Sequence, residues 1–516
     1  MRDWHPVAVA AVSAATTAAL SASCDRQRQT MIPRIPRTVC TSWARGFFLI
    51  AVAMFSIGCG AARDATSSGE PDDAGLANAD DPDPDISTAE WAALLALSPT
   101  PLPTSPPDVT NRFADSAAAA ALGQKLFFDT SFSGPLLDSD NDGSSSALGT
   151  MGQTGRVACA GCHLPKSGFS DTRSFQLQVS LGAGWGRRRA PSLLDVGQAR
   201  LIMWDGRRDA LYNQPFGPLE TVVEMNSSRL FMAERLYAEY QSDYEAVFGA
   251  MPPLGDATQF PPLSAELTGC QPTAATSSSP PPTCNGTFHG MPGDHAEFDG
   301  MTADNQTAVT QVVVNAGKAI GAFERLLTCG PAPFDAWMHG AAPVSRAAQR
   351  GAAVFVGAGQ CTTCHSGPFM SDQQFHNVGL MPELVQQAFV DSNDQGAFTG
   401  IASALADPLD TKGAFSDGYD GRLPAAVTPA MEGAFRTPIL RCVSVRPTFM
   451  HTGQLGSLTD VVAFFDEGGN VGGYPGTSEI HPLGLTALQQ SDLVAFLQSL
   501  LGPGANPAYD QQAPAQ

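Results

Sequence analysis

Two Cys-x-x-Cys-His motifs contain the residues of this chain that are best suited to chemistry. One is CAGCH, residues 159–163, and the other is CTTCH, residues 361–365. In each motif the two thiols lie one helical turn apart, where they can add to the two vinyl groups of a haem, and the histidine can ligate the haem iron. The sequence therefore predicts two covalently bound haem c groups. The predicted attachment residues are Cys159, Cys162, Cys361 and Cys364, and the predicted iron ligands are His163 and His365.

Two other uses of Cys-x-x-Cys pairs fit this sequence less well. A zinc ribbon places its pairs roughly 15 to 20 residues apart and needs no histidine directly after each pair. A thioredoxin-like redox pair would need a βαβ setting, and none is apparent around either copy. The recurrence of the full pentapeptide favours haem attachment.

The composition is that of an acidic globular protein. The chain has 516 residues, of which 43% are hydrophobic, and this length allows two or three domains with substantial cores. It carries 29 Lys and Arg against 50 Asp and Glu, which argues against a nucleic-acid surface. An acidic surface suits a basic protein partner, although a solubilising role is the commoner reason for one.

The N-terminal region has the features of an export signal. An apolar run at 46–58 follows a segment that contains three arginines, and it is too short to span a bilayer but suits a signal peptide. The four residues that end at Cys59 resemble a lipobox. We therefore expect residues 1–59 to be a leader, with export to the periplasm and a membrane attachment only through a lipid anchor on Cys59. Met31 is the expected true start, and cleavage at Cys24 is the alternative.

The rest of the chain divides by composition. Residues 60–87 are acidic and rich in Pro, Gly and Ser, which is typical of a disordered tether. A Pro/Gly/Ser/Thr-rich stretch later in the chain reads as an insert. The expected divisions are an N-terminal haem domain at 88–330 with an insert at 251–301, a C-terminal haem domain at 331–502, and a tail at 503–516.

Several short segments occur twice, once around each motif. The related pairs are 121–128 with 348–355, 168–171 with 369–372, 189–193 with 436–440, and 203–206 with 450–453. Two diverged copies of one haem domain would explain this pattern. It also places Trp204 and His451 at equivalent positions.

Helical apolar spacing dominates the remaining sequence. The expected helices are 88–97, 116–128 with Ser116 as its cap, 230–248, 309–327, and a last helix that starts at Thr486 with Gln489 completing a capping box. The predicted fold is therefore mainly α, with two cytochrome c-like domains related by internal duplication and preceded by a disordered tether.

Four cysteines outside the leader and the motifs could form disulfides. Cys270 and Cys284 flank a Ser/Pro-rich segment and could close it, which would leave Cys329 to pair with Cys442. The sequence does not settle this connectivity.

Several further blocks accompany the two motifs, namely MWDGR at 203–207, Gln214, EMN at 224–226, and the RTPILR…MHTG blocks that start at Arg436. With these blocks in place, the chain resembles the bacterial di-haem cytochrome c peroxidase and MauG family. The resemblance covers roughly residues 112–502. It implies that one haem meets hydrogen peroxide, and that electrons from a small cytochrome c or cupredoxin enter at the other. The alternatives are a MauG-like oxidase that modifies a partner protein and an electron-transfer cytochrome without peroxidase activity.

The same resemblance implies roles for four further residues. Trp204 matches the tryptophan that relays electrons between the haems, and His451 is its counterpart in the second half. Gln214 and Glu224 match the polar pair of the peroxide pocket. Because cleavage of an O–O bond requires a proton to move from the near oxygen to the leaving one, Glu224 is the expected acid/base.

Two departures from the family pattern concern the far side of each iron. Where classical family members have a removable histidine, this chain has Ala183, which cannot ligate iron, so the first haem should keep an open site as in the MauG-like branch. The usual far ligand of the second haem, Met or Tyr, is replaced by Phe465. That haem is then five-coordinate, water-bound, or ligated by Met450, Tyr474 or His481.

A third departure concerns the calcium ion that the family holds between its domains. At the positions of its ligands this chain has Arg189, Arg446 and Thr448. A guanidinium group cannot coordinate a cation, and two of them would repel it. We therefore predict that calcium is absent or replaced by arginine salt bridges.

Overall fold

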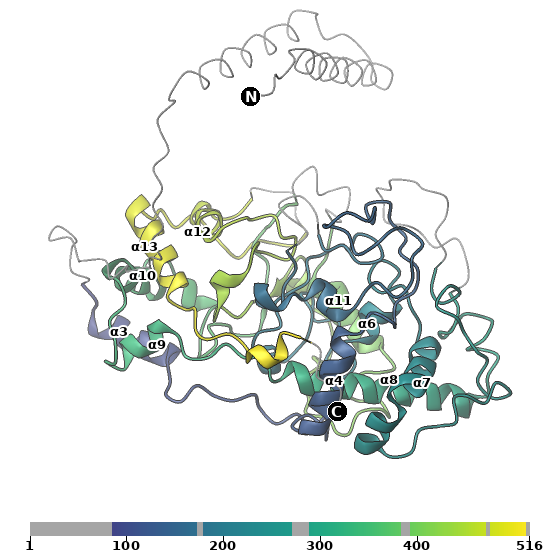
Figure 1. Cartoon of the computed structure of the whole chain (residues 1–516). Coiled ribbons are helices and arrows are strands. Elements are labelled where there is room, and N and C mark those ends of the chain that lie inside the picture. The colour runs from purple at the N-terminus through teal and green to yellow at the C-terminus, as the bar shows by residue number, and fades with distance from the viewer. Residues whose placement is uncertain (1–84, 173–178, 271–287, 383–392, 471–474, 512–516) are drawn as a thin grey trace, which may run out of the picture. The chain divides into compact units, whose positions relative to one another are not determined.

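The helices of this protein pack around two separate apolar cores (Figure 1). The computed structural model describes residues 85–172, 179–270, 288–382, 393–470 and 475–511. The predicted leader and nearly all of the predicted tether lie outside these residues. Within the described part, no helix is both long and apolar enough to cross a membrane.

The elements follow one another as short helices joined by long irregular segments. The α-helices are α3 (Thr88–Leu97), α4 (Ala117–Phe128), α5 (Cys159–Cys162), α6 (Phe216–Glu220), α7 (Arg229–Phe248), α8 (Ala303–Glu324), α9 (Pro333–Met338), α10 (Arg346–Val356), α11 (Ala397–Ala406), α12 (Leu458–Glu467) and α13 (Ala487–Gln498). Single 3-10 turns lie at Pro165–Ser167, Val196–Gln198, Cys361–Thr363, Pro429–Met431, Val443–Val445 and Pro507–Tyr509. Strands β1 (Phe375–His376) and β2 (Phe435–Arg436) form an antiparallel pair, with Phe375 opposite Arg436.

Two of the expected helix starts are confirmed by their caps, whereas the helix expected at 309–327 spans Ala303–Glu324 and is capped by Thr302. The Ser116 side chain accepts a hydrogen bond from the Ala119 amide at the start of α4. Thr486 and Gln489 form the predicted capping box of α13. These short polar signals therefore set where the helices begin, because they satisfy amides that have no partner within the helix.

The first core lies among α4, α7 and α8, and the second lies among α3, α9, α10, α12 and α13. One glycine makes the closest helix crossing in each. A Cβ at Gly123 of α4 would collide with the Ala319 carbonyl of α8, and a Cβ at Gly351 of α10 would collide with the Asp492 carbonyl of α13. The absence of a side chain lets each pair of helices approach closely.

Helix α3 packs differently from the expected domain division, which placed residue 88 onward in the N-terminal domain. Its buried residues Leu94 and Leu97 belong to the second core, with Phe334 and Phe496. Figure 1 shows α3 beside α9. The apolar face of this ten-residue helix is thus buried against elements far along the chain.

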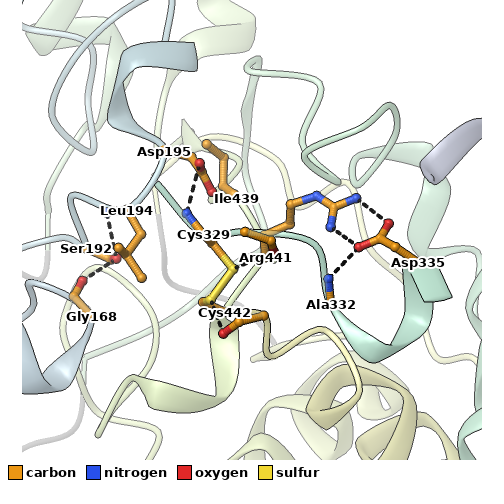
Figure 2. Close-up of a disulfide and its surroundings, with 12 residues drawn as sticks. Gly168, Ser192, Leu194, Asp195, Cys329, Ala332, Asp335, Ile439, Arg441 and Cys442 are labelled. Atoms are coloured by element: carbon orange, nitrogen blue, oxygen red, sulfur yellow. Dashed lines mark hydrogen bonds and ion pairs between the residues drawn. A yellow bond between two sulfur atoms is a disulfide. The ribbon is translucent and has the colours of Figure 1, made fainter. Parts of the chain in front are cut away.

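A disulfide joins Cys329, shortly after α8, to Cys442 in the second half, as one of the two expected pairings (Figure 2). The Cys329 amide donates to Asp195 Oδ1 at 3.2 Å. Beside the disulfide, the fully buried Arg441 forms a two-pronged ion pair with Asp335 at 2.8 and 3.0 Å. Cys270 is also disulfide-bonded, while Cys284 lies outside the described residues.

Candidate haem sites

The first haem site consists of Cys159, Cys162 and His163. The two thiols stand at the ends of the single turn α5, and the histidine caps it. His163 Nδ1 donates to the Phe169 carbonyl at 3.0 Å. Burial lowers the pKa of His163, so its ring is neutral and Nε2 keeps a lone pair for a metal.

The second haem site, Cys361, Cys364 and His365, repeats this arrangement. His365 Nδ1 donates to the Met370 carbonyl at 2.8 Å. Burial lowers the pKa of His365 to about 4. In both sites the residue that offers the carbonyl has left-handed backbone, with φ of 54° at Phe169 and 51° at Met370. This strained turn aims the carbonyl at the ring.

A cavity of about 310 Å³ adjoins the second haem site. Cys361, Cys364 and His365 form one wall, and most of the remaining lining is apolar. Two thiols, one imidazole nitrogen and an apolar cavity fit a covalently attached porphyrin. At the first site the donor set is the same, and it fits the same group.

Ala183, which the sequence has where a removable histidine was expected, is fully buried. Its amide donates to the Glu224 carbonyl at 2.7 Å. A Cβ at the preceding Gly182 would clash with the Glu224 backbone, so the two segments are in close contact. The only side-chain atom that this position offers is a methyl carbon, which cannot ligate iron.

Glu224 lies next to Ala183 through a backbone hydrogen bond, whereas Gln214 lies next to Met203. Burial raises the pKa of Glu224, while the charges of Arg207 and Arg208 act against this rise. Gln214 Nε2 donates to Met203 Sδ at 3.5 Å. A carboxyl group that keeps its proton to a higher pH than an ordinary glutamate can serve as an acid as well as a base.

Trp204 is fixed from both halves of the chain. Its Nε1 donates to the Arg189 carbonyl at 2.7 Å, and its carbonyl accepts from the Arg436 amide at 2.8 Å. It also lines the cavity of the second haem site. An electron relay needs rigid placement, because a mobile ring would vary its distances to the redox groups.

His451 lies on that cavity too, and it does not join Glu224 and Gln214. Its ring stacks on Phe435 with centroids 3.6 Å apart and planes inclined by 14°. Burial lowers its pKa to about 3, so it is neutral at any physiological pH. The Arg188 guanidinium lies 5.2 Å above the Phe435 ring. His451 therefore lies at the second haem site.

Phe465 lines the cavity of the second haem site, as do Met450 and His481. Phenylalanine has no lone pair, so it gives the iron no ligand there. Of the three alternative ligands expected from the sequence, Met450 and His481 are placed at this cavity, and Tyr474 lies outside the described residues.

Arg446 does not form the salt bridge that the sequence offered as one of two alternatives to a bound calcium ion. Among the described residues, no carboxylate lies within ion-pair distance of its guanidinium, and its Nη2 donates to the Ile439 carbonyl at 2.6 Å. Arg189, Arg446 and Thr448 all line the cavity together with a third arginine, Arg436. Sequence reasoning missed Arg436 as a site residue, because it was noticed only as a marker of the repeat.

Comparison with known proteins gives consistent matches. A family model described as di-haem cytochrome c peroxidase matches residues 117–268. Cytochrome-c peroxidase IdrP1 of Denitromonas iodatirespirans is 28% identical over 426 residues, which cover 80% of this chain and 87% of that protein. Methylamine utilization protein MauG of Methylorubrum extorquens is 29% identical over 384 residues, which cover 74% and 77%. The solved structure of the diheme peroxidase BthA from Burkholderia thailandensis E264 is 20% identical, with a TM-score of 0.49, and the match covers 81% of this chain and 100% of that one.

Proposed function

Since the chain belongs to the family of di-haem cytochrome c peroxidases and MauG proteins, and is thereby an oxidoreductase, we propose that it reduces hydrogen peroxide to water at the first haem site. Each peroxide consumes two electrons and two protons and yields two water molecules. A small periplasmic cytochrome c or cupredoxin supplies the electrons singly through the second haem site.

Bound haem c would supply an iron that binds peroxide at the first site and one that accepts electrons at the second. Cys159 and Cys162 hold the first haem, and Cys361 and Cys364 hold the second. His163 and His365 supply the near ligands. Their Nδ1 hydrogen bonds fix the ring orientation and leave Nε2 facing away from the carbonyl.

Glu224 acts as the general acid and base in this proposal. It takes the proton from the peroxide oxygen nearer the site and returns one to the oxygen that leaves as water. Gln214, which is held by its hydrogen bond to Met203 Sδ, orients the peroxide. The single observation that carries the proposal is the backbone hydrogen bond from Ala183 to Glu224, which joins a position without any ligating atom to a residue whose carboxyl group has a raised pKa.

Electrons travel between the two halves by way of Trp204. Its hydrogen bonds to Arg189 and Arg436 support this role, because they hold the indole at the boundary between the first half and the second. His451, neutral and stacked on Phe435, packs the second haem site.

A MauG-like oxidase that modifies a partner protein is the second candidate. It is favoured by the same open position at Ala183 and by the 29% identity to MauG. Phe465 counts against it, because it replaces the tyrosine ligand that the resemblance associates with MauG. A simple electron carrier is disfavoured, since it would need ligands on both faces of both irons.

We also propose that the two halves are diverged copies of one domain. Matching backbone features support this duplication. They are left-handed residues at Phe169 and Met370, at Asp195 and Cys442, and at Met203 and Met450, and the 3-10 turns Val196–Gln198 and Val443–Val445.

Export to the periplasm, with attachment to the membrane through Cys59, is the proposed localisation. The signal-like run at 46–58 and the residues that end at Cys59 support it. The mass of the mature N-terminal peptide tests this proposal, because a lipid on Cys59 adds a defined increment.

The decisive assay uses the purified protein with two haems per chain. Peroxide should drive oxidation of a reduced small cytochrome or of a dye. A protein that carries both haems and oxidises neither would contradict the peroxidase proposal. If peroxide instead cross-links or oxidises an added partner protein, the MauG-like function replaces it.

A further inference from the structure

Two buried arginines and one partly buried arginine line the cavity of the second haem site. Arg189 and Arg436 are 2% and 8% exposed. Arg446 has a buried Nε that meets no hydrogen-bond acceptor. Arg189 comes from the first half of the chain and the other two from the second, so the cluster spans the boundary that Trp204 also crosses. We call these three residues the arginine cluster.

The arginine cluster is charged, and the described contacts of two of its members are with neutral groups. Burial lowers the pKa of each guanidinium to about 10, and the charge of Arg436 contributes to the lowering at Arg446. Because a pKa of about 10 is well above neutral pH, all three remain protonated there. The Arg436 guanidinium donates to Gln373 Oε1 at 3.2 Å and to the Met203 carbonyl at 3.4 Å, and that of Arg446 donates to the Ile439 carbonyl.

Nearby carboxyl groups compensate this charge only in part. Asp171 raises the pKa of Arg189, and Asp195 raises that of Arg446. Burial holds the pKa of Asp195 at about 7, so this group is partly neutral itself. The lining of the cavity includes one carboxylate, Glu479, which is bonded to His376 at 2.7 Å. The cavity therefore has an excess of positive charge.

Buried cations without matching anions are costly, and they persist where a ligand supplies the anions. The group that fits this cavity, a haem held by Cys361 and Cys364, carries two propionate carboxylates. Guanidinium groups bind carboxylates through two parallel N–H···O bonds, which is the strongest common form of this contact.

We propose that Arg189, Arg436 and Arg446 bind the two propionates of the second haem, and that this arginine cluster raises the reduction potential of that haem. The proposal rests on the assignment of two haems but not on peroxide chemistry. Positive charge beside the haem stabilises the reduced form, which carries one positive charge less. Trp204 lies beside this cluster, because its indole donates to the Arg189 carbonyl and its own carbonyl accepts from the Arg436 amide.

Spectroelectrochemical titration of the two-haem protein, without peroxide, tests the proposal. In Arg446→Gln the reduction potential of the second haem should fall by about 59 mV. This fall corresponds to an about tenfold lower ratio of reduced to oxidised haem at a fixed potential. Arg446→Lys keeps the charge and should lie between that variant and the wild type. Arg187→Gln is the matched control, because Arg187 is exposed and lies two residues before Arg189. It should leave the potential unchanged.

An unchanged potential in Arg446→Gln, or an equal fall in Arg187→Gln, would overturn the proposal. Haem content is measured for each variant. If Arg446→Gln does not retain the second haem, the two lysine variants Arg446→Lys and Arg436→Lys decide. A wild-type potential in Arg446→Lys, together with full haem content in Arg436→Lys, would show that the forked contacts do not matter. Peroxidase activity is assayed separately, so its absence bears only on the proposed function.

Discussion

Glu224 combines burial with a fixed backbone, and these two properties have different sources. Burial in the first half raises its pKa, whereas the hydrogen bond from Ala183 holds its main chain. A carboxyl group used in proton transfer needs both, because its proton affinity must suit the reaction and its position must suit the substrate.

Replacement of Glu224 by Gln should lower kcat for peroxide reduction by about 10²–10⁴-fold, since the amide cannot accept and return a proton. Steady-state assays with a reduced dye measure this effect. The visible spectrum should stay that of the wild type. Glu234→Gln is the control, because Glu234 is another carboxyl whose pKa burial raises, to about 7, but it lies in α7 and accepts from the Leu263 amide. Equal losses in both variants would refute the special role of Glu224.

Asp195 should make the protein less stable as pH rises. Burial raises its pKa from 3.8 to about 7, so between these values the folded protein holds a proton that the unfolded chain releases. Stability then falls with rising pH in this window, by at most about 1.4 kcal/mol per pH unit, and the effect is complete above pH 7. In Asp195→Asn, which can still accept from the Cys329 amide, Tm should fall less between pH 4 and pH 7. Parallel Tm curves for the two proteins would contradict this prediction.

At the scale of elements, much of the local structure follows from the sequence. Helix α3 was predicted with its observed bounds, and Ser116 and Thr486 begin their helices as expected, because capping depends on neighbours three residues away. The packing of α3 against the second core could not be predicted, since Leu94 meets partners that lie far along the chain. The same holds for Arg436, which only the fold brings to the same cavity as Arg189 and Arg446.

The glycine crossings of the two cores should be sensitive to a single methyl group. In Gly123→Ala the new Cβ collides with the Ala319 carbonyl of α8, so α4 must shift, at a cost of about 1–3 kcal/mol. Thermal unfolding should show a lower Tm. Gly504→Ala serves as control, because a Cβ there meets no atom within 4 Å. A Gly123→Ala variant as stable as that control would show that the crossing is not tight.

At the scale of the whole molecule, three kinds of contact join the halves. The disulfide Cys329–Cys442 is covalent, Arg188 pairs with Asp394, and Trp204 is bonded on both sides. The sequence offered Cys329 and Cys442 as a possible pair, but the ion pair of Arg188 with Asp394 had no local signal. These contacts fix how the two candidate haem sites lie relative to Trp204.

Removal of calcium should leave the protein unchanged. The guanidinium groups of Arg189 and Arg446 cannot coordinate the ion and would repel it. After treatment with a calcium chelator, the visible spectrum and Tm should equal those of untreated protein. A loss of Tm that added calcium restores, and magnesium does not, would contradict the prediction.

The electron paramagnetic resonance spectrum of the oxidised protein, with both haems bound, tests most directly whether peroxide meets an open iron at the first site. Ala183 offers no ligand there, so we predict a high-spin haem signal without prior reduction, and its conversion to a low-spin signal when cyanide is added. A spectrum that contains only low-spin, six-coordinate haems, unchanged by cyanide, would contradict the proposed site of peroxide reduction.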